Sequence, residues 1–260
     1  MTPRSRQLAL AALPVFVLLL AGAAWQWHQG TQTLWRFVSQ GCLLAAQSGH
    51  GTGRCAEVSI ERGADRGHVV FKDRNGPLQY LVMPTRRVSG VEDPFLLQPD
   101  APAYWAEAWR ARRWMAVSQG GPVPREAVSI TVNPKWGRSQ GQLHLHISCV
   151  RPDLRALLQS SPAAQSGTWT TLPGGWQGHA YEVRRVIADD LDGHDLFKEV
   201  ARQHAGTMDR QGLAAIATRA GDGRNGFWFL RTQTDLPALW LGAIEGDVQD
   251  HTCAELQRGR

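Results

Sequence analysis

The sequence predicts an α+β protein: an antiparallel sheet with helices, preceded by an N-terminal transmembrane helix and followed by a smaller α+β second half. Three observations predict this class. Residues 8–24 form an uncharged apolar run, an Asn-Gly pair at 75–76 separates two strand-like runs, and residues 101–118 carry apolar side chains at helical spacing. We therefore divide the chain into an anchor or uncleaved signal (1–30), a first half (31–157) and a C-terminal half packed on it (158–260).

The N-terminal segment predicts the compartment. Arg4 and Arg6 precede the apolar run, and Trp25 and Trp27 follow it. The run has the length of a short membrane-spanning helix, and tryptophans are typical of the membrane interface. A signal peptide cut at the small residues 21–24 is the alternative, although the run exceeds the usual length of such peptides. Both interpretations keep the arginines inside and place the rest of the chain outside the cytoplasm.

The composition is that of a globular protein, with 43% apolar residues and a net charge of +5. Lys72, Lys135 and Lys198 are the only lysines among 28 basic residues, so arginine carries the charge. Arginine favours bidentate contacts to phosphate, but a biased genome composition would produce the same excess. The chain has no basic run, recognition motif or stacking platform, and we therefore predict no nucleic-acid partner.

Four cysteines are present, at positions 42, 55, 149 and 253. An even number of cysteines outside the cytoplasm predicts disulfides. A bond between Cys42 and Cys55 would close a short loop and leave Cys149 for Cys253, but three connectivities are possible and the spacing does not choose among them. No C-x-x-C pair supports a metal site.

Periodicity and turn signals predict the remaining elements. Helices are expected at 31–47, 101–118, 195–204 and 236–248. Strands are expected at 68–71, 78–83, 127–132, 142–150, 179–186, 213–218 and 226–231. Residues 158–178 are rich in Ser, Gly and Pro and predict a linker or excursion between the halves. A degenerate repeat of the first half is an open interpretation of the second, although no clear internal identity supports it.

The segment 142–147 alternates polar and aliphatic residues. Because side chains alternate along a strand, Gln142, His144 and His146 are expected on one face and the aliphatic residues on the core face. One imidazole could then attack phosphorus and the other transfer a proton. By spacing alone, however, this pattern also fits a metal-ligand pair or a solvated face.

Two motifs carry a resemblance to a known superfamily. The run G-R-S-Q-G-Q-L-H-L-H-I at 137–147 resembles the histidine-triad (HIT) signature, and residues 70–89 resemble the ribose-binding hairpin of that superfamily. N-G-P-L-Q-Y-L-V-M-P, H-L-H-I-S-C-V-R-P-D, L-P-G-G-W-Q-G-H-A-Y and Q-D-H-T-C narrow the resemblance to bacterial CDP-diacylglycerol pyrophosphatases. These matches extend from about Leu34 to Cys253, and they imply a HIT-like sheet.

The resemblance implies the roles of individual residues. His144 corresponds to the nucleophile that takes the nucleotidyl group, and His146 to the histidine that contacts the phosphate. Ser139 corresponds to the hydroxyl near the leaving-group oxygen, Asn133 to a phosphate contact, and Asp73 to the carboxylate that holds the ribose hydroxyls.

Three further residues of the same motifs belong to the predicted site. Lys72 and Gly137 are expected to contact the substrate. Gln142 stands where the signature has its first histidine, and glutamine can both donate and accept in its place. We expect this departure from the signature to affect the rate of hydrolysis more than its chemical mechanism.

The function that the resemblance implies is hydrolysis of CDP-diacylglycerol to CMP and phosphatidate, with no metal and no organic cofactor. The protein would be held in the bacterial inner membrane by a single span, with its catalytic part in the periplasm. Two alternatives remain: a hydrolase of a soluble nucleotide conjugate, and a membrane-tethered protein that binds nucleotides or anionic lipids without turnover. An apolar groove beside His144 would favour the lipid. The sequence predicts no oligomeric state.

Overall fold

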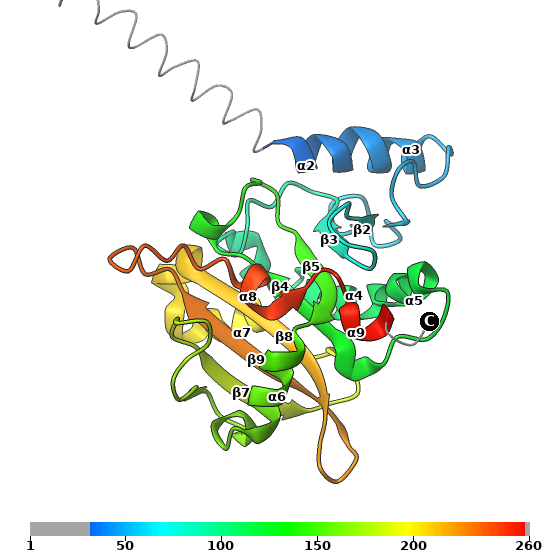
Figure 1. Cartoon of the computed structure of the whole chain (residues 1–260). Helices are drawn as coiled ribbons and strands as arrows, with labels where there is room; N and C mark the ends of the chain where they lie inside the picture. The colour runs from blue at the N-terminus through cyan, green and yellow to red at the C-terminus, as the bar shows by residue number, and fades with distance from the viewer. Residues whose placement is uncertain (1–31, 258–260) are drawn as a thin grey trace, which may run out of the picture.

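The computed structural model describes residues 32–257, which form a mostly antiparallel sheet flanked by short helices (Figure 1). The strands follow the order β1-β2-β3-β5-β4-β8-β9-β7-β6, and β10 pairs with β5 off this path. Their bounds are β1 (Glu57–Ser59), β2 (His68–Lys72), β3 (Tyr80–Pro84), β4 (Val128–Val132), β5 (Leu145–Val150), β6 (Thr170–Thr171), β7 (Glu182–Ile187), β8 (Gln211–Arg219), β9 (Asn225–Gln233) and β10 (Gln249–Asp250).

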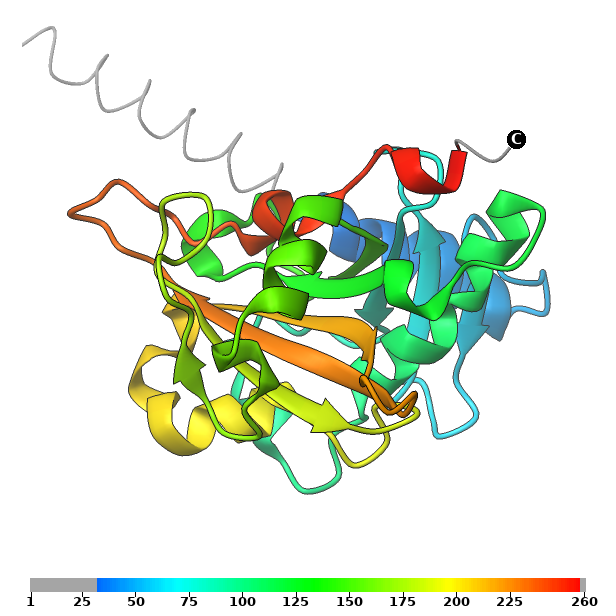
Figure 2. The same cartoon turned by 60° about the horizontal axis from the view of Figure 1, so that its bottom comes forward.

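Helices cover both faces of this sheet (Figures 1 and 2). One face packs against α4 (Tyr104–Ala111), α5 (Arg113–Gln119) and α7 (Leu196–His204). The other face packs against α6 (Pro152–Ser160) and α8 (Ile244–Val248). The N-terminal helix comprises α2 (Thr33–Arg36), the π-helical η1 (Phe37–Leu43) and α3 (Leu44–Gln47), and α9 (Ala254–Gln257) lies near the C-terminus.

The hairpin of β2 and β3 is confirmed, with Val70 opposite Val82 in the register. Its turn needs a glycine because Gly76 has a φ of +77°, and a Cβ there would lie 1.9 Å from the carbonyl oxygen of His251. The Lys72 ammonium donates hydrogen bonds to the carbonyls of Asp73 (2.5 Å) and Gly76 (2.9 Å) and so braces the turn.

The stripe predicted on the helix over 101–118 is buried, with Ala108 and Met115 both fully inaccessible to solvent. The helix itself is broken at Arg112, between α4 and α5. Trp109 packs its ring edge-on against Phe227 at a centroid distance of 4.9 Å. Residues 101–118 therefore form two short helices whose apolar side packs in the core.

Two other predicted elements have different limits. The strand expected at 142–150 begins only at Leu145, so Gln142 and His144 precede it. The helix expected at 236–248 was wrong over most of its length, since only α8 is helical. The preceding chain closes a tight hairpin instead, in which Asp235 and Trp240 form an isolated antiparallel bridge.

Both disulfides are formed, and they have the connectivity that the short-loop interpretation gave. Cys42 bonds to Cys55 and ties η1 to the strand region that follows. Cys149 bonds to Cys253 and ties the C-terminal segment to β5 across a separation of 104 residues.

The predicted fold class was wrong in treating the second half as a separate, smaller α+β unit. Strand β8 of the second half pairs with β4 of the first, with Ile130 opposite Ala215, so one sheet runs through both halves. Without β8, β4 would present an unpaired row of backbone N–H and C=O groups, which proteins avoid at a sheet edge. Pairing across the halves removes that edge.

The transmembrane helix was the second wrong part of the predicted fold class. Across residues 32–257, no helix is both long enough and apolar enough to cross a membrane. A span needs about 20 consecutive apolar residues, whereas the helices on the sheet are short and turn one apolar side to the core. The apolar run at 8–24 lies outside the described residues.

Candidate active site

A cavity of about 650 Å³ opens between the β2–β3 hairpin, β5, the loop 133–140, the N-terminal helix and α8. Six of the predicted site residues line it: Asp73, Asn133, Gly137, Ser139, His144 and His146. They come from two parts of the sequence, the β2–β3 hairpin and residues 133–146, which the pairing of β3 with β5 brings together. The predicted alternation in 142–147 holds, because Leu143, Leu145 and Ile147 lie in the core.

The His144 imidazole is buried, with 7% of the residue exposed. Its Nδ1 lies 2.7 Å from the carbonyl oxygen of Gln142. A carbonyl only accepts hydrogen bonds, so Nδ1 carries the proton and Nε2 keeps its lone pair. Burial, and next the charge of His146, lower the pKa of His144 to about 4. The ring is therefore neutral at ordinary pH, with Nε2 in the form of a nucleophile.

His146 is held by a carboxylate. Its Nδ1 lies 3.0 Å from Oε1 of Glu245 on α8, and its ring centroid lies 4.7 Å from that of His144. Burial alone would raise the pKa of Glu245, but the charge and hydrogen bond of His146 outweigh it and lower the pKa to about 2. Nε2 of His146 is buried and has no hydrogen-bond partner among the described residues. This second nitrogen is thus available for a phosphate oxygen.

Gln79 of the hairpin connects two carboxylates of the site. Its fully buried amide nitrogen lies 3.1 Å from Oδ2 of Asp73 and 3.2 Å from Oε1 of Glu245. The same nitrogen lies 3.3 Å from Nδ1 of His146. An amide nitrogen carries two hydrogens, and the carboxylates take both, so the third contact is a close approach and not a hydrogen bond.

Glu245 is the residue that the sequence analysis missed. Asn133 donates to Oε2 of Glu245 (3.1 Å) and accepts from its backbone N–H (3.1 Å), which attaches the N-terminal end of α8 to the loop. His251 lies with Nε2 3.3 Å from Oε1 of the same carboxylate. The only sequence signal was a cluster of acidic and histidine residues near the end of the chain.

Two predicted substrate contacts lie outside the cavity. The Gln142 side chain is fully buried; it accepts from the backbone N–H of Val88 (3.3 Å) and donates to the carbonyls of Pro84 (3.1 Å) and Arg86 (3.0 Å). It therefore anchors the segment after β3 against the chain that leads to His144. Lys72 braces the hairpin turn, as described above.

Three arginines and two carboxylates, those of Asp73 and Glu245, line the cavity. Arg138 lines it and forms two hydrogen bonds with Glu92, of 2.8 and 2.5 Å. Arg54 and Arg74 also line it, and neither forms an ion pair with any residue in the described part of the chain. Guanidinium groups match the geometry of phosphate oxygens, so the cavity suits a doubly charged pyrophosphate.

Part of the cavity wall is apolar. Leu34 and Phe37 of the N-terminal helix face Phe71 and Leu81 of the hairpin, and the two phenylalanine rings lie 4.5 Å apart. The Leu34 backbone N–H donates to Oε1 of Gln140 at 3.1 Å, which joins the helix to the loop. An apolar wall beside His144 is the feature that favours a substrate with a large apolar or aromatic part.

Comparison with known proteins shows the family of the chain. Residues 29–257 match the model of the family described as CDP-diacylglycerol pyrophosphatase. The chain belongs to that family. The CDP-diacylglycerol pyrophosphatase of Yersinia pestis is 38% identical over 251 residues, which cover 95% of this chain and 94% of that protein. The predicted activity, hydrolysis of the CDP-diacylglycerol pyrophosphate bond, is thus confirmed, whereas the link to the histidine-triad superfamily stays a prediction.

Replacing Glu245 with glutamine removes the charge that pairs with His146. We expect kcat for CMP release to fall about 10²-fold, because a hydrogen bond to a charged group contributes about 1.5–3 kcal/mol. The fold should be unaffected, since glutamine keeps the size of the side chain. Glu255→Gln is the matched control: its carboxylate pairs with Arg155 on the surface, and the change should leave kcat unaltered. An unchanged kcat in Glu245→Gln would contradict the role given to this carboxylate.

Proposed function

We propose that the protein hydrolyses CDP-diacylglycerol to CMP and phosphatidate in two displacements at His144. One observation carries this proposal: the Gln142 carbonyl binds Nδ1 of His144 and so leaves Nε2 as the nucleophile. The buried, neutral imidazole is therefore held in the tautomer that attack on phosphorus requires, and it lines the cavity.

In the first displacement, Nε2 of His144 attacks the cytidine-bearing phosphorus. An N–P bond forms, and the bond from that phosphorus to the bridging oxygen breaks with its electron pair on phosphatidate. In its protonated form His146, held through Nδ1 by Glu245, donates from Nε2 to an oxygen of the transferred phosphate, and Arg138 lines the same cavity. Ser139 lies at the cavity rim, where its hydroxyl can donate to the leaving oxygen.

The second displacement returns the enzyme to its starting state. His144 still holds its proton on Nδ1, so the nucleotidyl-imidazole is cationic and a good leaving group. Water adds to phosphorus, the N–P bond breaks, and CMP leaves with the hydroxyl oxygen of that water. The remaining proton passes to solvent. No step needs a metal ion or an organic cofactor, and we therefore expect full turnover in the presence of a chelator.

Different side chains of the cavity suit the cytosine and the ribose of the substrate. The aromatic part formed by Phe37 and Phe71 can pack against the cytosine ring. Asp73 lies on the same side, and its carboxylate is oriented by the backbone N–H of Asn75 (3.1 Å) and by Gln79 (3.1 Å). We therefore assign it to the ribose hydroxyls.

The covalent step is tested with CDP-diacylglycerol that carries ³²P in the cytidine-bearing phosphate. After a rapid alkaline quench, we expect label on the protein that survives alkali and is lost in acid, as a phosphoramidate requires. In ¹⁸O-water the heavy oxygen should enter CMP and not phosphatidate. Heavy oxygen in phosphatidate would show attack on the other phosphorus and would exclude this mechanism.

The acid limb of the pH profile follows from the environment of His144. Its folded-state pKa lies at about 4, below the usual value of 6.5, so Nε2 keeps its lone pair until the pH falls through about 4. Glu245, with a pKa of about 2, stays ionised through this window. We expect kcat/KM to fall tenfold per pH unit only below about pH 4. A fall that already begins near pH 6.5 would mean that the nucleophile is a solvated histidine.

We also propose that the catalytic part lies outside the cytoplasm, in the periplasm. The two disulfides support this location, because such bonds persist in oxidising compartments and are rare in the cytoplasm. Added protease should therefore reach the protein in bacteria whose outer membrane is permeabilised. Protection until the inner membrane is lysed would argue against this location.

A further inference from the structure

A short apolar hairpin projects from the body of the protein between β9 and α8, and it is visible in both overall views (Figures 1 and 2). Asp235 and Trp240 close it with two backbone hydrogen bonds of 2.9 and 2.8 Å. The four residues between them, Leu-Pro-Ala-Leu, have no polar side chain. Turns of this kind usually carry Gly, Asn, Asp or Ser.

The leucines of this hairpin are turned to solvent. Leu236 is 49% exposed, Leu239 88% and Leu241 46%. Leu239 also has a φ of +56°, a conformation that costs energy for a bulky residue and that glycine or asparagine would adopt more readily. Both the exposure and the conformation are unfavourable for the isolated protein in water, which indicates a function for the apolar tip.

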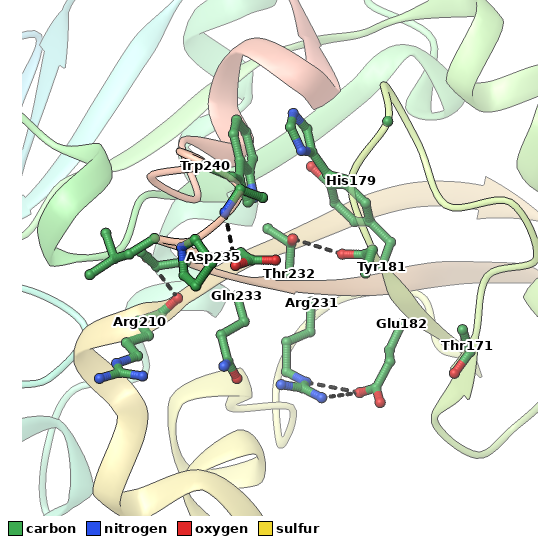
Figure 3. A pocket seen from close by; sticks show the side chains of 16 residues that line it. Thr171, His179, Tyr181, Glu182, Arg210, Arg231, Thr232, Gln233, Asp235 and Trp240 are labelled. Carbon is green, nitrogen blue, oxygen red and sulfur yellow. Dashed lines mark hydrogen bonds and ion pairs between the residues drawn. The ribbon is translucent and has the colours of Figure 1, made fainter.

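The base of the hairpin is firmly attached. Figure 3 shows Trp240 beside His179, and their rings stack at a centroid distance of 3.6 Å with 10° between the planes. The Asp235 carboxylate accepts a hydrogen bond from the Ala238 N–H at 3.3 Å. The tip is therefore presented by a defined scaffold, above a cavity in which Arg231 pairs with Glu182.

The hairpin adjoins the rim of the active site. A Cβ on Gly137 would lie 3.1 Å from the Leu241 carbonyl oxygen and 2.9 Å from the Ala243 nitrogen, so the catalytic loop packs directly on the hairpin base. Next to Gly137, Trp136 is 51% exposed. Two positions after Ala243 comes Glu245, which holds His146.

Basic side chains flank these apolar ones. Lys135 lies 6.0 Å from the centroid of the Trp136 ring, and Arg210 lines the cavity below the hairpin. Within residues 32–257 neither side chain forms an ion pair. Exposed Trp and Leu beside free cations is the pattern of a protein surface that lies in the interface of an anionic bilayer.

We propose that Trp136, Leu236, Leu239 and Leu241 form a membrane-docking surface that rests on the phospholipid bilayer containing the substrate. This inference rests on the proposed lipid hydrolysis, because the acyl chains of CDP-diacylglycerol hold it in a bilayer. Insertion of the hairpin tip brings the active-site rim to the headgroup level, where the pyrophosphate lies. His144 can then reach phosphorus without removing the lipid from the membrane.

The test compares Leu236→Ser/Leu239→Ser with Val117→Ser in the full chain. Val117, on α5, is 65% exposed and is the matched control for loss of an exposed apolar side chain. On CDP-diacylglycerol in vesicles of phosphatidylglycerol and phosphatidylethanolamine, we expect the double variant to raise KM at least about tenfold with kcat unchanged. On a water-soluble dibutyryl analogue all three proteins should be equal. Equal KM values on vesicles would overturn the docking surface.

A second measurement reports insertion directly. Leu239→Cys and Val117→Cys are labelled with a polarity-sensitive fluorophore under non-reducing conditions, and the same vesicles are added. We expect a blue shift only for the label at position 239, and a shift that requires phosphatidylglycerol would show the part played by the cations. No shift at position 239 would exclude insertion. If the wild type cleaves neither the lipid nor the soluble analogue, the proposed function fails first, so the two failures are distinguishable.

Discussion

Replacing His144 with asparagine should lower kcat for CMP release by at least about 10⁴-fold, the scale seen when a nucleophile is removed. An amide nitrogen has no lone pair free to attack phosphorus, whereas its size and hydrogen bond to the Gln142 carbonyl can be retained. The variant should therefore bind CMP within about threefold of the wild type. The measurements are steady-state CMP release and titration calorimetry with CMP.

The control for this prediction is His204→Asn, at the end of α7. It changes the same functional group on a helix that does not line the cavity and should leave kcat unaltered. Residual activity in His144→Asn above about one per cent of the wild type, together with ³²P label still on the protein, would assign the nucleophile to another residue.

Removing the disulfide between Cys149 and Cys253, by serine at both positions, should lower the free energy of unfolding by about 4–5 kcal/mol. The bond closes a loop of 104 residues, and the loop-entropy contribution increases with loop length. For a protein of this size the melting temperature should fall by roughly 10–15 °C. Differential scanning calorimetry of the oxidised wild type and the variant measures both quantities.

The second disulfide provides the comparison. Cys42 and Cys55 are separated by 13 residues, so serine at both positions should cost only about 3 kcal/mol. The Cys149–Cys253 variant should also lose kcat near its melting temperature, because Cys253 holds the segment that carries His251 against Glu245. An equal or larger loss of stability in the Cys42–Cys55 variant would contradict the loop-length argument.

The local parts of the fold were predictable because their signals are local. The Asn-Gly turn and its flanking apolar runs predicted the β2–β3 hairpin, and period-two alternation in 142–147 placed His144 and His146 on the face away from the core. The helix expected at 195–204 is α7, and its N-cap Asp195 accepts from the backbone N–H of Phe197 at 3.0 Å. In each case the physical cause lies within about ten residues.

The missing parts of the site depend on long-range contacts. Glu245 fell within the helix expected at 236–248, and no local pattern links it to Asn133, 112 residues earlier, or to Gln79, 166 residues earlier. Gln142 was assigned to the substrate because it occupies a motif position, but its side chain satisfies backbone groups of the neighbouring segment. Whether a polar side chain is buried depends on the distant residues that pack over it, and the motif does not contain those residues.

The sequence by itself predicted the centre of the candidate site: His144 and His146 on one face of an extended segment, preceded by a Gly- and Ser-containing loop. Only the tertiary structure decided which nitrogen of His144 bonds to the Gln142 carbonyl, which carboxylate holds His146, and that one sheet runs through both halves. Side-chain alternation follows from backbone geometry within a few residues. Which distant residue bonds to a given side chain depends on which strands pair, and that pairing is settled by the packing of the whole chain.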